Sequence, residues 1–290
     1  MKNPILEGYN ADPDIDVFNG KYYIYPTRCK SEEKNTAFEV FSSDDLKTWK
    51  KEGTILDFKD VPWTENKWAW APAICERNGK YYLYYSGNCN IGVAVSDSPA
   101  GRFTDKGTPL VAKDDYPGLM IDPEVFIDDD GTAYFYWGNQ HLYATILNDD
   151  MMSFKEEVRE ITPSSYTEAP CIFKRNGIYY FTWSLGDTCR HDYHVRYGRS
   201  SGPLEKPKGD DIILHCDFAH DKRIRCTGHH SILNIPGTDE WYIIYHRFNT
   251  ELYGDVEGLC NEAAGYREIC IDRLYFDEDG NILPVKPTND

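Results

Sequence analysis

A unit repeated five times along the chain most constrains how it can fold. Each copy runs from a short opening motif through an apolar stretch and a tight turn into an aromatic-rich stretch. One copy opens at Asp122, turns at Asp130-Gly131 and ends in Tyr-Phe-Tyr-Trp, residues 134–137. The copies start roughly 45 to 60 residues apart, a spacing typical of propeller blades and other repeat units. The chain therefore predicts a closed array of equivalent β units.

Local signals within each unit predict antiparallel strands. Hairpin turns occur at Asn19-Gly20, Asn78-Gly79, Asp130-Gly131 and Asn176-Gly177, dipeptides that suit two-residue hairpin loops. A third run and a short fourth run follow most of these hairpins, and no convincing amphipathic helix is present. We therefore predict an all-β fold, a five-bladed β-propeller with four-stranded antiparallel blades. Residues 1–290 should form a single propeller domain, in which the C-terminal segment 280–285 closes the ring against strands near the N-terminus.

Composition narrows the class of partner. The net charge is −17 and no stripe of Lys or Arg occurs, which argues against nucleic acid because phosphate binding needs clustered cations. The 22 tyrosines and 7 tryptophans suit stacking against sugar rings. No stretch has the length and apolarity of a membrane span. We expect a small neutral oligosaccharide as the partner, and neither nucleic acid nor a membrane.

The N-terminal residues and the cysteines suggest a compartment. Residues 1–6 show no apolar run of signal-peptide length, and the nine cysteines are an odd number without paired CxxC spacing. A disulfide framework and a zinc framework are both disfavoured by that pattern. The sequence therefore predicts a cytoplasmic protein with reduced thiols, and it sets no oligomeric state.

Acidic residues open several of the repeated units. In a propeller the first strand of each blade lines the central channel, so the opening residues should meet at one end of it. The residues brought together in this way are Asp12, Asp122, Glu168 and His229, with Trp70 beside the matching position of the remaining blade. Converging carboxylates repel one another and raise each other's pKa. They suit either a hard-cation site or glycoside hydrolysis, and the abundant aromatics favour the sugar.

Short motifs in order along nearly the whole chain resemble glycoside hydrolase family 43. They are Asn10-Ala11-Asp12-Pro13, Trp70-Ala71-Pro72, Ile121-Asp122-Pro123, Thr167-Glu168-Ala169-Pro170, Gly228-His229 and Tyr266-Arg267-Glu268. Each motif alone is weak, and the ordered set is strong. The resemblance implies a five-bladed propeller that hydrolyses arabinose- and xylose-containing glycans with inversion.

The resemblance also implies roles for single residues. Asp12 matches the general base that activates water, Glu168 matches the general acid, and Asp122 matches a third carboxylate that orients the acid and keeps its pKa high. An inverting enzyme leaves room for a water between base and acid, so their carboxyl groups should lie about 6.5–9.5 Å apart. Asp14 and Glu124 share a strand face with these groups and should lie deeper.

The resemblance also implies residues around the sugar and around the propeller axis. Arg267 matches an arginine that reaches the innermost sugar, and Trp70 matches an aromatic wall, with plain core packing as its alternative. His229 matches a histidine facing an axial cation, usually calcium, although His230 follows it and either imidazole could face the axis. We expect Ser86, Asn139 and His246 to line the pocket, with a purely structural role as the alternative for His246. No organic cofactor is expected.

The predicted activity is that of an inverting exo-glycosidase. It would remove terminal α-L-arabinofuranosyl or β-D-xylosyl residues from arabinoxylan- or arabinan-derived oligosaccharides. Two alternatives remain open at this point: a galactan- or arabinan-cleaving hydrolase of the same fold, and a sugar-binding propeller without catalysis. We expect the long irregular stretches at residues 28–35 and 247–265 to form binding loops.

Overall fold

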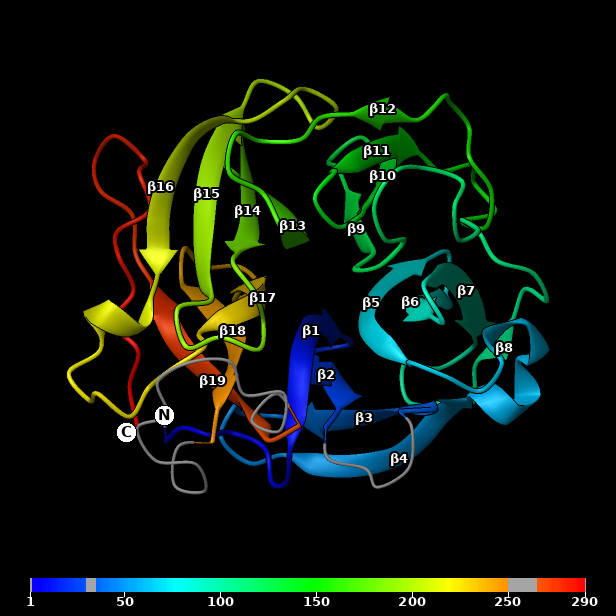
Figure 1. Cartoon of the computed structure of the whole chain (residues 1–290), viewed down its shortest axis with the longest axis horizontal. Coiled ribbons are helices and arrows are strands. Elements are labelled where there is room, and N and C mark those ends of the chain that lie inside the picture. Colours follow the sequence, from blue (N-terminus) through cyan, green and yellow to red (C-terminus); the bar gives the residue numbers. More distant parts are fainter. Residues whose placement is uncertain (1, 30–34, 250–264, 290) are drawn as a thin grey trace.

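Five antiparallel sheets surround a central axis in the computed structural model, which describes residues 2–29, 35–249 and 265–289 (Figure 1). Blade one comprises β1 (Asn10–Phe18), β2 (Lys21–Arg28), β3 (Ala37–Ser43) and β4 (Lys50–Asp57), and blade two comprises β5 (Trp70–Arg77), β6 (Lys80–Gly87), β7 (Asn90–Ser96) and β8 (Thr104–Asp105). Blade three comprises β9 (Glu124–Ile127), β10 (Ala133–Trp137), β11 (Tyr143–Ile146) and β12 (Arg159–Glu160). Blade four comprises β13 (Glu168–Arg175), β14 (Ile178–Leu185), β15 (His194–Ser200) and β16 (Lys208–Leu214), and blade five comprises β17 (Gly228–Asn234), β18 (Trp241–Phe248) and β19 (Arg267–Leu274).

The prediction of an all-β five-bladed propeller is confirmed. Blade five departs from it in detail, because it contains three strands among the described residues where four were predicted. The only helical segments in the described ranges are three short 3₁₀ turns: η1 (Phe58–Asp60), η2 (Pro62–Thr64) and η3 (Cys216–Phe218). None of the helices found there is long and apolar enough to cross a membrane. Most of both expected binding loops, residues 30–34 and 250–264, lies outside the described residues.

Neighbouring blades pack through shared clusters of buried aromatic and aliphatic side chains. Tyr25 and Phe38 of blade one pack with Leu83 and Tyr85 of blade two, and all four are fully buried. Comparable clusters join each of the other adjacent pairs, including blade five with blade one. Burial of such a side chain contributes about 1.5–3 kcal/mol. The aromatic-rich second strands of the repeated unit therefore hold the blades in a fixed ring.

The start of each innermost strand has an unusual backbone. One non-glycine residue per blade adopts a positive φ there: Asp12 (46°), Ala71 (44°), Asp122 (55°), Ala169 (55°) and His229 (35°). In blades one, two, four and five the strand pairing shifts register at the same place, as in a β-bulge. Bulges re-aim side chains, and such backbone costs of order 1–3 kcal/mol per residue and clusters at functional sites.

This backbone pattern changes the expected alignment of the units. The equivalent positions are Asp12, Asp122 and His229, whereas Glu168 and Trp70 each stand one residue before the equivalent Ala169 and Ala71. Glu168 and Trp70 pair instead with Ser184 and Ser86 of the next strands. The two sets of side chains therefore leave the backbone one residue apart, at a bend that re-aims them.

The two ends of the chain join different blades. Ile5 N–H donates to Ile269 O of β19 at 2.9 Å, so the N-terminal segment adds to blade five. Val285 N–H donates to Ile213 O of β16 at 2.7 Å, which places the 280–285 segment on the outer edge of blade four. This differs from the expected closure against N-terminal strands. The outer edge strand β16 has unpaired backbone groups that the tail satisfies. The C-terminal tail contacts the N-terminal segment beyond residue 285, where Asn3 Nδ2 donates to Thr288 O at 3.2 Å.

Candidate active site

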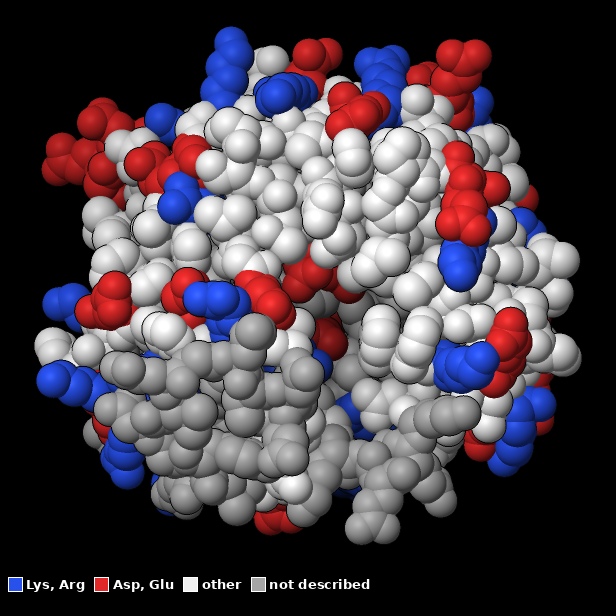
Figure 2. All heavy atoms as spheres, in the orientation of Figure 1, with Lys and Arg blue, Asp and Glu red and all other residues white. Residues whose placement is uncertain are grey.

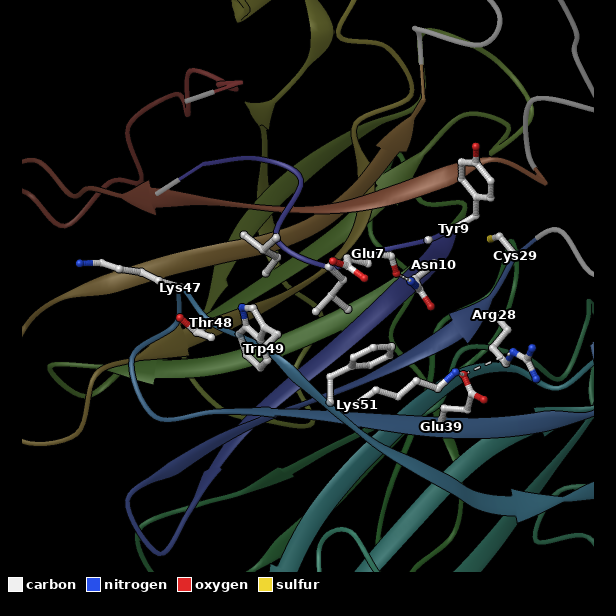
Figure 3. A pocket seen from close by; sticks show the side chains of 14 residues that line it. Glu7, Tyr9, Asn10, Arg28, Cys29, Glu39, Lys47, Thr48, Trp49 and Lys51 are labelled. Carbon is white, nitrogen blue, oxygen red and sulfur yellow. Dashed lines mark hydrogen bonds and ion pairs between the residues drawn. The ribbon is translucent and has the colours of Figure 1, made fainter.

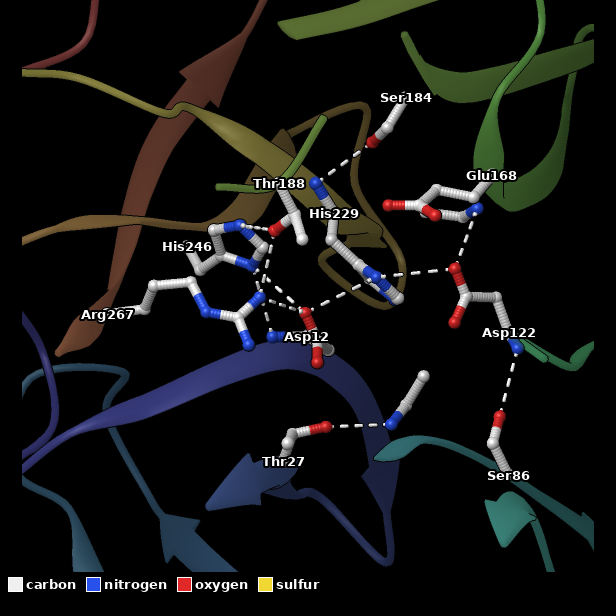
Figure 4. A network of polar contacts seen from close by, with 12 residues as sticks. Asp12, Thr27, Ser86, Asp122, Glu168, Ser184, Thr188, His229, His246 and Arg267 are labelled. Carbon is white, nitrogen blue, oxygen red and sulfur yellow. Dashed lines mark hydrogen bonds and ion pairs between the residues drawn. The ribbon is translucent and has the colours of Figure 1, made fainter. Parts of the chain in front are cut away.

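The candidate site lies where the blades meet the axis. Figure 2 shows a hollow at the centre of this face, with acidic side chains at its floor. Asp12 and Asp122 are each only 6% exposed, and Figure 4 shows them converging with Glu168, His229 and Arg267. The three carboxylates predicted to meet do lie in one contact network.

Asp12 is surrounded by cationic and imidazole groups. Arg267 Nη1 lies 3.0 Å from its Oδ1, and His229 Nδ1 lies 3.4 Å from the same oxygen. Burial opposes ionisation of Asp12, yet the Arg267 guanidinium and the nearby His229 outweigh it and hold the pKa of Asp12 well below its ordinary value. Asp12 is therefore kept as a carboxylate, the state that a general base requires.

Glu168 receives two neutral hydrogen bonds. Tyr193 donates its hydroxyl to Oε1 at 2.9 Å, and Asn139 Nδ2 donates to Oε2 at 2.8 Å. Burial raises the pKa of Glu168 above its ordinary value, and the Asp12 charge adds to that rise against the effect of the two donors. A carboxyl group in such surroundings can hold a proton for delivery to a leaving group. Asn139, which was predicted to line the pocket and is partly exposed, also fixes the candidate acid.

Asp122 connects the two halves of the network. Its Oδ2 accepts the backbone N–H of Ala169 at 3.1 Å and lies 3.7 Å from His229 Nδ1. Burial, together with the charges of Glu168 and Asp12, raises the pKa of Asp122 well above its ordinary value. The site thus combines one carboxyl that is held ionised with two whose ionisation is opposed.

A set of hydrogen bonds between blades supports this geometry. In each case the N–H of a residue with positive φ donates to a side chain on the second strand of the preceding blade. The pairs are Ala71 to Thr27 Oγ1 (2.7 Å), Asp122 to Ser86 Oγ (3.0 Å), His229 to Ser184 Oγ (2.9 Å) and Asp12 to His246 Nδ1 (3.3 Å). These acceptors secure the strained backbone that aims the site residues.

Two pocket-lining predictions are corrected by this arrangement. Ser86 and His246 are both 0% exposed, so neither side chain can contact a sugar. Burial lowers the pKa of His246 to about 3, and a neutral imidazole can accept the Asp12 N–H. Both residues therefore hold the backbone of a candidate catalytic carboxylate. The structural alternative for His246 agrees with the geometry.

Trp70 stands beside a second tryptophan. Its indole stacks on Trp68 with ring centroids 5.3 Å apart and an interplanar angle of 15°. Trp70 is half-buried, and Trp68 is 41% exposed. The pair presents an aromatic surface at the start of β5, suited to the apolar face of a sugar ring.

Two residues of the network were not anticipated from the sequence. Thr188 Oγ1 accepts a hydrogen bond from Arg267 Nη1 at 3.1 Å, and Tyr193 holds Glu168. Both belong to the connection between β14 and β15, residues 186–193, which carries no repeat-unit signal. Their positions depend on the path of an irregular loop, so no local pattern marks them.

A narrow channel continues below the carboxylates along the axis. Asp14, Glu124, His230 and Ser231 line it, and its cavity volume is about 10 Å³, about the room that one water or ion needs. Among the described residues, His230 Nδ1 and Ser231 Oγ are buried without a hydrogen-bond partner. His229, by contrast, turns its Nδ1 toward the catalytic carboxylates. Both His229 and His230 line this channel, and His230 Nε2 lies 2.6 Å from Thr182 Oγ1 of β14.

A larger cleft of about 700 Å³ lies beside blade one, between the N-terminal segment and strands β3 and β4 (Figure 3). Glu39 on its wall pairs with Lys51 at 2.7 Å and with Arg28 at 3.5 Å. None of the three candidate catalytic carboxylates lines this cleft. The convergence of carboxylates, and not cavity size, therefore locates the candidate site.

Comparison with known proteins agrees with this site. The family model for glycosyl hydrolases family 43 matches residues 1–282. A β-D-galactofuranosidase of Aspergillus niger is 38% identical over 99% of this chain and 85% of that protein. Xylosidase/arabinosidase 43A of Humicola insolens is 33% identical over 96% of this chain and 97% of that protein. A crystal structure of a β-xylosidase/α-arabinofuranosidase from a compost microbial metagenome, with xylotriose and in calcium-free form, superposes with a TM-score of 0.81 at 28% identity, covering 98% and 97% of the two chains.

A propeller with three carboxylates at its axis, together with these relatives, defines a glycoside hydrolase. Catalysis in this class rests on a proton donor and an ionised carboxylate, the two states that the site separates. The chain belongs to glycosyl hydrolase family 43.

Proposed function

We propose that this enzyme is an inverting exo-glycosidase with Asp12 as general base and Glu168 as general acid. One observation carries the assignment: the surroundings of Asp12 lower its pKa, whereas those of Glu168 raise its pKa. Opposite shifts in neighbouring carboxyls are how a site separates base from acid. Asp122 is fixed by the Ala169 N–H, and a negative charge on either Asp122 or Glu168 disfavours ionisation of the other.

The reaction follows from those protonation states. Glu168 gives its proton to the glycosidic oxygen as the bond from that oxygen to the anomeric carbon breaks. Asp12 accepts a proton from a water whose oxygen bonds to the anomeric carbon from the opposite face. The product sugar leaves with inverted anomeric configuration. We assign Arg267 a contact to a sugar hydroxyl, and its guanidinium 3.0 Å from Asp12 Oδ1 keeps Asp12 ionised.

The proposed substrates are terminal α-L-arabinofuranosyl and β-D-xylosyl residues of arabinoxylan- or arabinan-derived oligosaccharides. The xylosidase/arabinosidase names of relatives and the xylotriose complex support this choice. The 38% identical galactofuranosidase favours a second candidate, β-D-galactofuranosyl. That sugar has the same ring configuration as α-L-arabinofuranosyl and differs by one added hydroxymethyl carbon, so the space beyond C4 decides between them.

A panel of p-nitrophenyl glycosides tests the proposal: α-L-arabinofuranoside, β-D-xylopyranoside, β-D-galactofuranoside and β-D-galactopyranoside. We expect hydrolysis of one or both of the first two, with Asp12→Asn reducing kcat by about 10²–10⁴-fold. Glu168→Gln should show a similar loss on xylobiose, whose leaving group needs protonation. A protein that binds these sugars but hydrolyses none, and whose binding survives both substitutions, would be the non-catalytic propeller.

Product analysis separates exo from endo action. With xylotriose or a linear arabino-oligosaccharide, an exo enzyme releases single sugars from the first turnover. An internal cut would release disaccharides and longer fragments before monosaccharide, and would favour the arabinan- or galactan-cleaving alternative.

We also propose one cation, calcium as the first candidate, in the channel below the active site. Asp14 and Glu124 offer the oxygen ligands that calcium prefers, and the unpartnered Ser231 Oγ and His230 Nδ1 are polar groups that a hydrated ion would satisfy. When bound, the ion would balance buried negative charge. The cluster in the described part of the chain with three mutually close donor atoms is His215, Cys216 and Asp217 at η3, so an axial ion would rely partly on water.

Calorimetric titration of chelator-treated protein with Ca²⁺ tests the axial ion. We expect the titration to show one site and bound Ca²⁺ to raise the Tm in a thermal unfolding scan. Glu124→Gln should abolish both effects. Absence of binding in the wild-type protein, or binding unaffected by Glu124→Gln, would rule the axial site out.

A further inference from the structure

We propose that Tyr193 is a positioning residue that ties the candidate acid to the scaffold of the candidate base. This inference rests on the proposed roles of Glu168 and Asp12. The Tyr193 hydroxyl donates to Glu168 Oε1 at 2.9 Å. The same ring stacks on His246 with centroids 5.7 Å apart and an interplanar angle of 8°, and His246 Nδ1 accepts the Asp12 N–H. One side chain therefore spans the two sides of the site.

The protein leaves a fitted space for this ring. Tyr193 is fully buried and packs with Cys226 and Phe248. A Cβ on Gly228 would lie 2.2 Å from two Tyr193 ring carbons, which no structure tolerates without movement. Gly228 is thus required where the Gly228-His229 motif passes the ring. The Gly228-His229 motif therefore needs its glycine as well as its histidine, because the Tyr193 ring occupies the space of a Cβ.

Loss of the hydroxyl should change the acid in two ways. A donor to the carboxylate favours the ionised form, so its removal raises the pKa of Glu168, in line with the lowering effect of Tyr193 on that group. It also leaves Oε1 without its fixed partner, so the carboxyl can rotate away from the glycosidic oxygen. The charged groups near Glu168 that influence its pKa or share its contacts, Asp12, Asp122 and Arg267, all remain in place.

The test compares Tyr193→Phe with Tyr180→Phe on two leaving groups. Tyr180 is also fully buried and in blade four, but its hydroxyl donates to Gly280 O at 2.6 Å, far from the site in sequence and contact. p-Nitrophenolate leaves without protonation, whereas xylobiose, or the matching arabinobiose, needs the acid. Tyr193→Phe should lower kcat on the disaccharide about 10–100-fold, because a misplaced acid loses part of the 10²–10⁴-fold that general acid catalysis contributes. On the p-nitrophenyl glycoside the loss should be under about threefold.

The pH profile gives a readout that packing alone would not move. In Tyr193→Phe the basic limb of kcat/KM should shift to higher pH, because Glu168 keeps its proton longer. Tyr180→Phe should keep the wild-type profile and leaving-group ratio. Gly228→Ala, which displaces the ring instead of removing the hydroxyl, should reproduce the leaving-group pattern if it folds.

Two outcomes would overturn the inference in distinguishable ways. Equal losses on both leaving groups with an unshifted profile in Tyr193→Phe would show a structural role only, and would leave the proposed hydrolase intact. Wild-type activity in Glu168→Gln on the disaccharide would instead remove the proposed acid, and the Tyr193 role with it.

Discussion

The carboxylate of Asp122 accepts the backbone N–H of Ala169 at 3.1 Å, although hydroxyl or imidazole groups accept the matching N–H groups elsewhere in the ring. The reason lies at Gly138, which pairs with Ile121 and occupies the position that Ser86 holds in blade two. A Cβ there would lie 2.2 Å from His141 O, so no side chain can serve. Asp122 therefore fixes the peptide that follows Glu168 and also places a second carboxyl group beside it.

This double role predicts different outcomes for two substitutions of Asp122. Asp122→Asn keeps an oxygen acceptor for the Ala169 N–H, so stability should stay near wild type while kcat falls about 10²–10³-fold. Asp122→Ala leaves that buried N–H without a partner, which costs a further 1–3 kcal/mol or so of stability. Denaturant unfolding and kcat measured on both variants check this. Equal stability of the two variants would show that the hydrogen bond to Ala169 contributes nothing.

The pH dependence of kcat/KM should be bell-shaped, with its acid limb at lower pH and its basic limb at higher pH than unperturbed carboxyl groups would give. Asp12 acts ionised and its pKa is lowered, so activity should persist below about pH 4, where an ordinary Asp gains its proton. Glu168 acts protonated and its pKa is raised, so activity should survive above the ordinary Glu value of about 4.3 before it falls. Because Glu168 and Asp122 interact, the basic limb reports the pair. An acid limb near neutral pH would contradict the low pKa of Asp12.

Arg267 is predicted to act on Asp12 through both charge and shape. Arg267→Met removes the cation 3.0 Å from Asp12 Oδ1, so the pKa of Asp12 should rise and the acid limb should move to higher pH. Arg267→Lys keeps the charge but not the planar fork that also reaches Thr188. In Arg267→Lys the acid limb of the pH profile should lie close to its wild-type position, whereas kcat/KM should be at least about tenfold below wild type. The same acid limb in both variants would exclude the electrostatic role.

Trp70 and Trp68 are predicted to bind sugar by stacking. Trp70→Ala should raise KM about 5–30-fold with kcat within about threefold, since stacking of this kind is worth about 1–2 kcal/mol. Trp68→Ala should have a smaller effect, because Trp68 is 41% exposed at the rim. A large drop in Tm for Trp70→Ala with unchanged KM would instead mark it as a packing residue.

The repeated unit made much of the architecture predictable. Hairpin dipeptides and aromatic runs report local conformation, and their spacing set the number of blades. Asp12 and Asp122 occupy equivalent positions in their repeats, and equivalent positions in a closed ring lie around the same axis. Their proximity was therefore predictable. The one-residue offset of Glu168 was also readable: the positive-φ residue precedes proline in four blades, at Pro13, Pro72, Pro123 and Pro170. Aligned on those prolines, Ala169 and not Glu168 matches Asp12.

The rest of the site was not readable, for a physical reason. Ser86 and His246 were predicted to line the pocket but are fully buried, because burial behind the carboxylates depends on how adjacent blades close together. Tyr193 and Thr188 reach the network from an irregular loop, whose path is set by tertiary packing. Local sequence patterns carry no information on how adjacent blades close together or on the path of this loop.

The stereochemistry of the first-formed product tests the central assignment most directly. Proton NMR during early turnover of a β-D-xyloside, before mutarotation, should show α-D-xylose as the first anomer if Asp12 activates water opposite Glu168. β-D-Xylose appearing first would mean retention, and would contradict the roles given to Asp12 and Glu168.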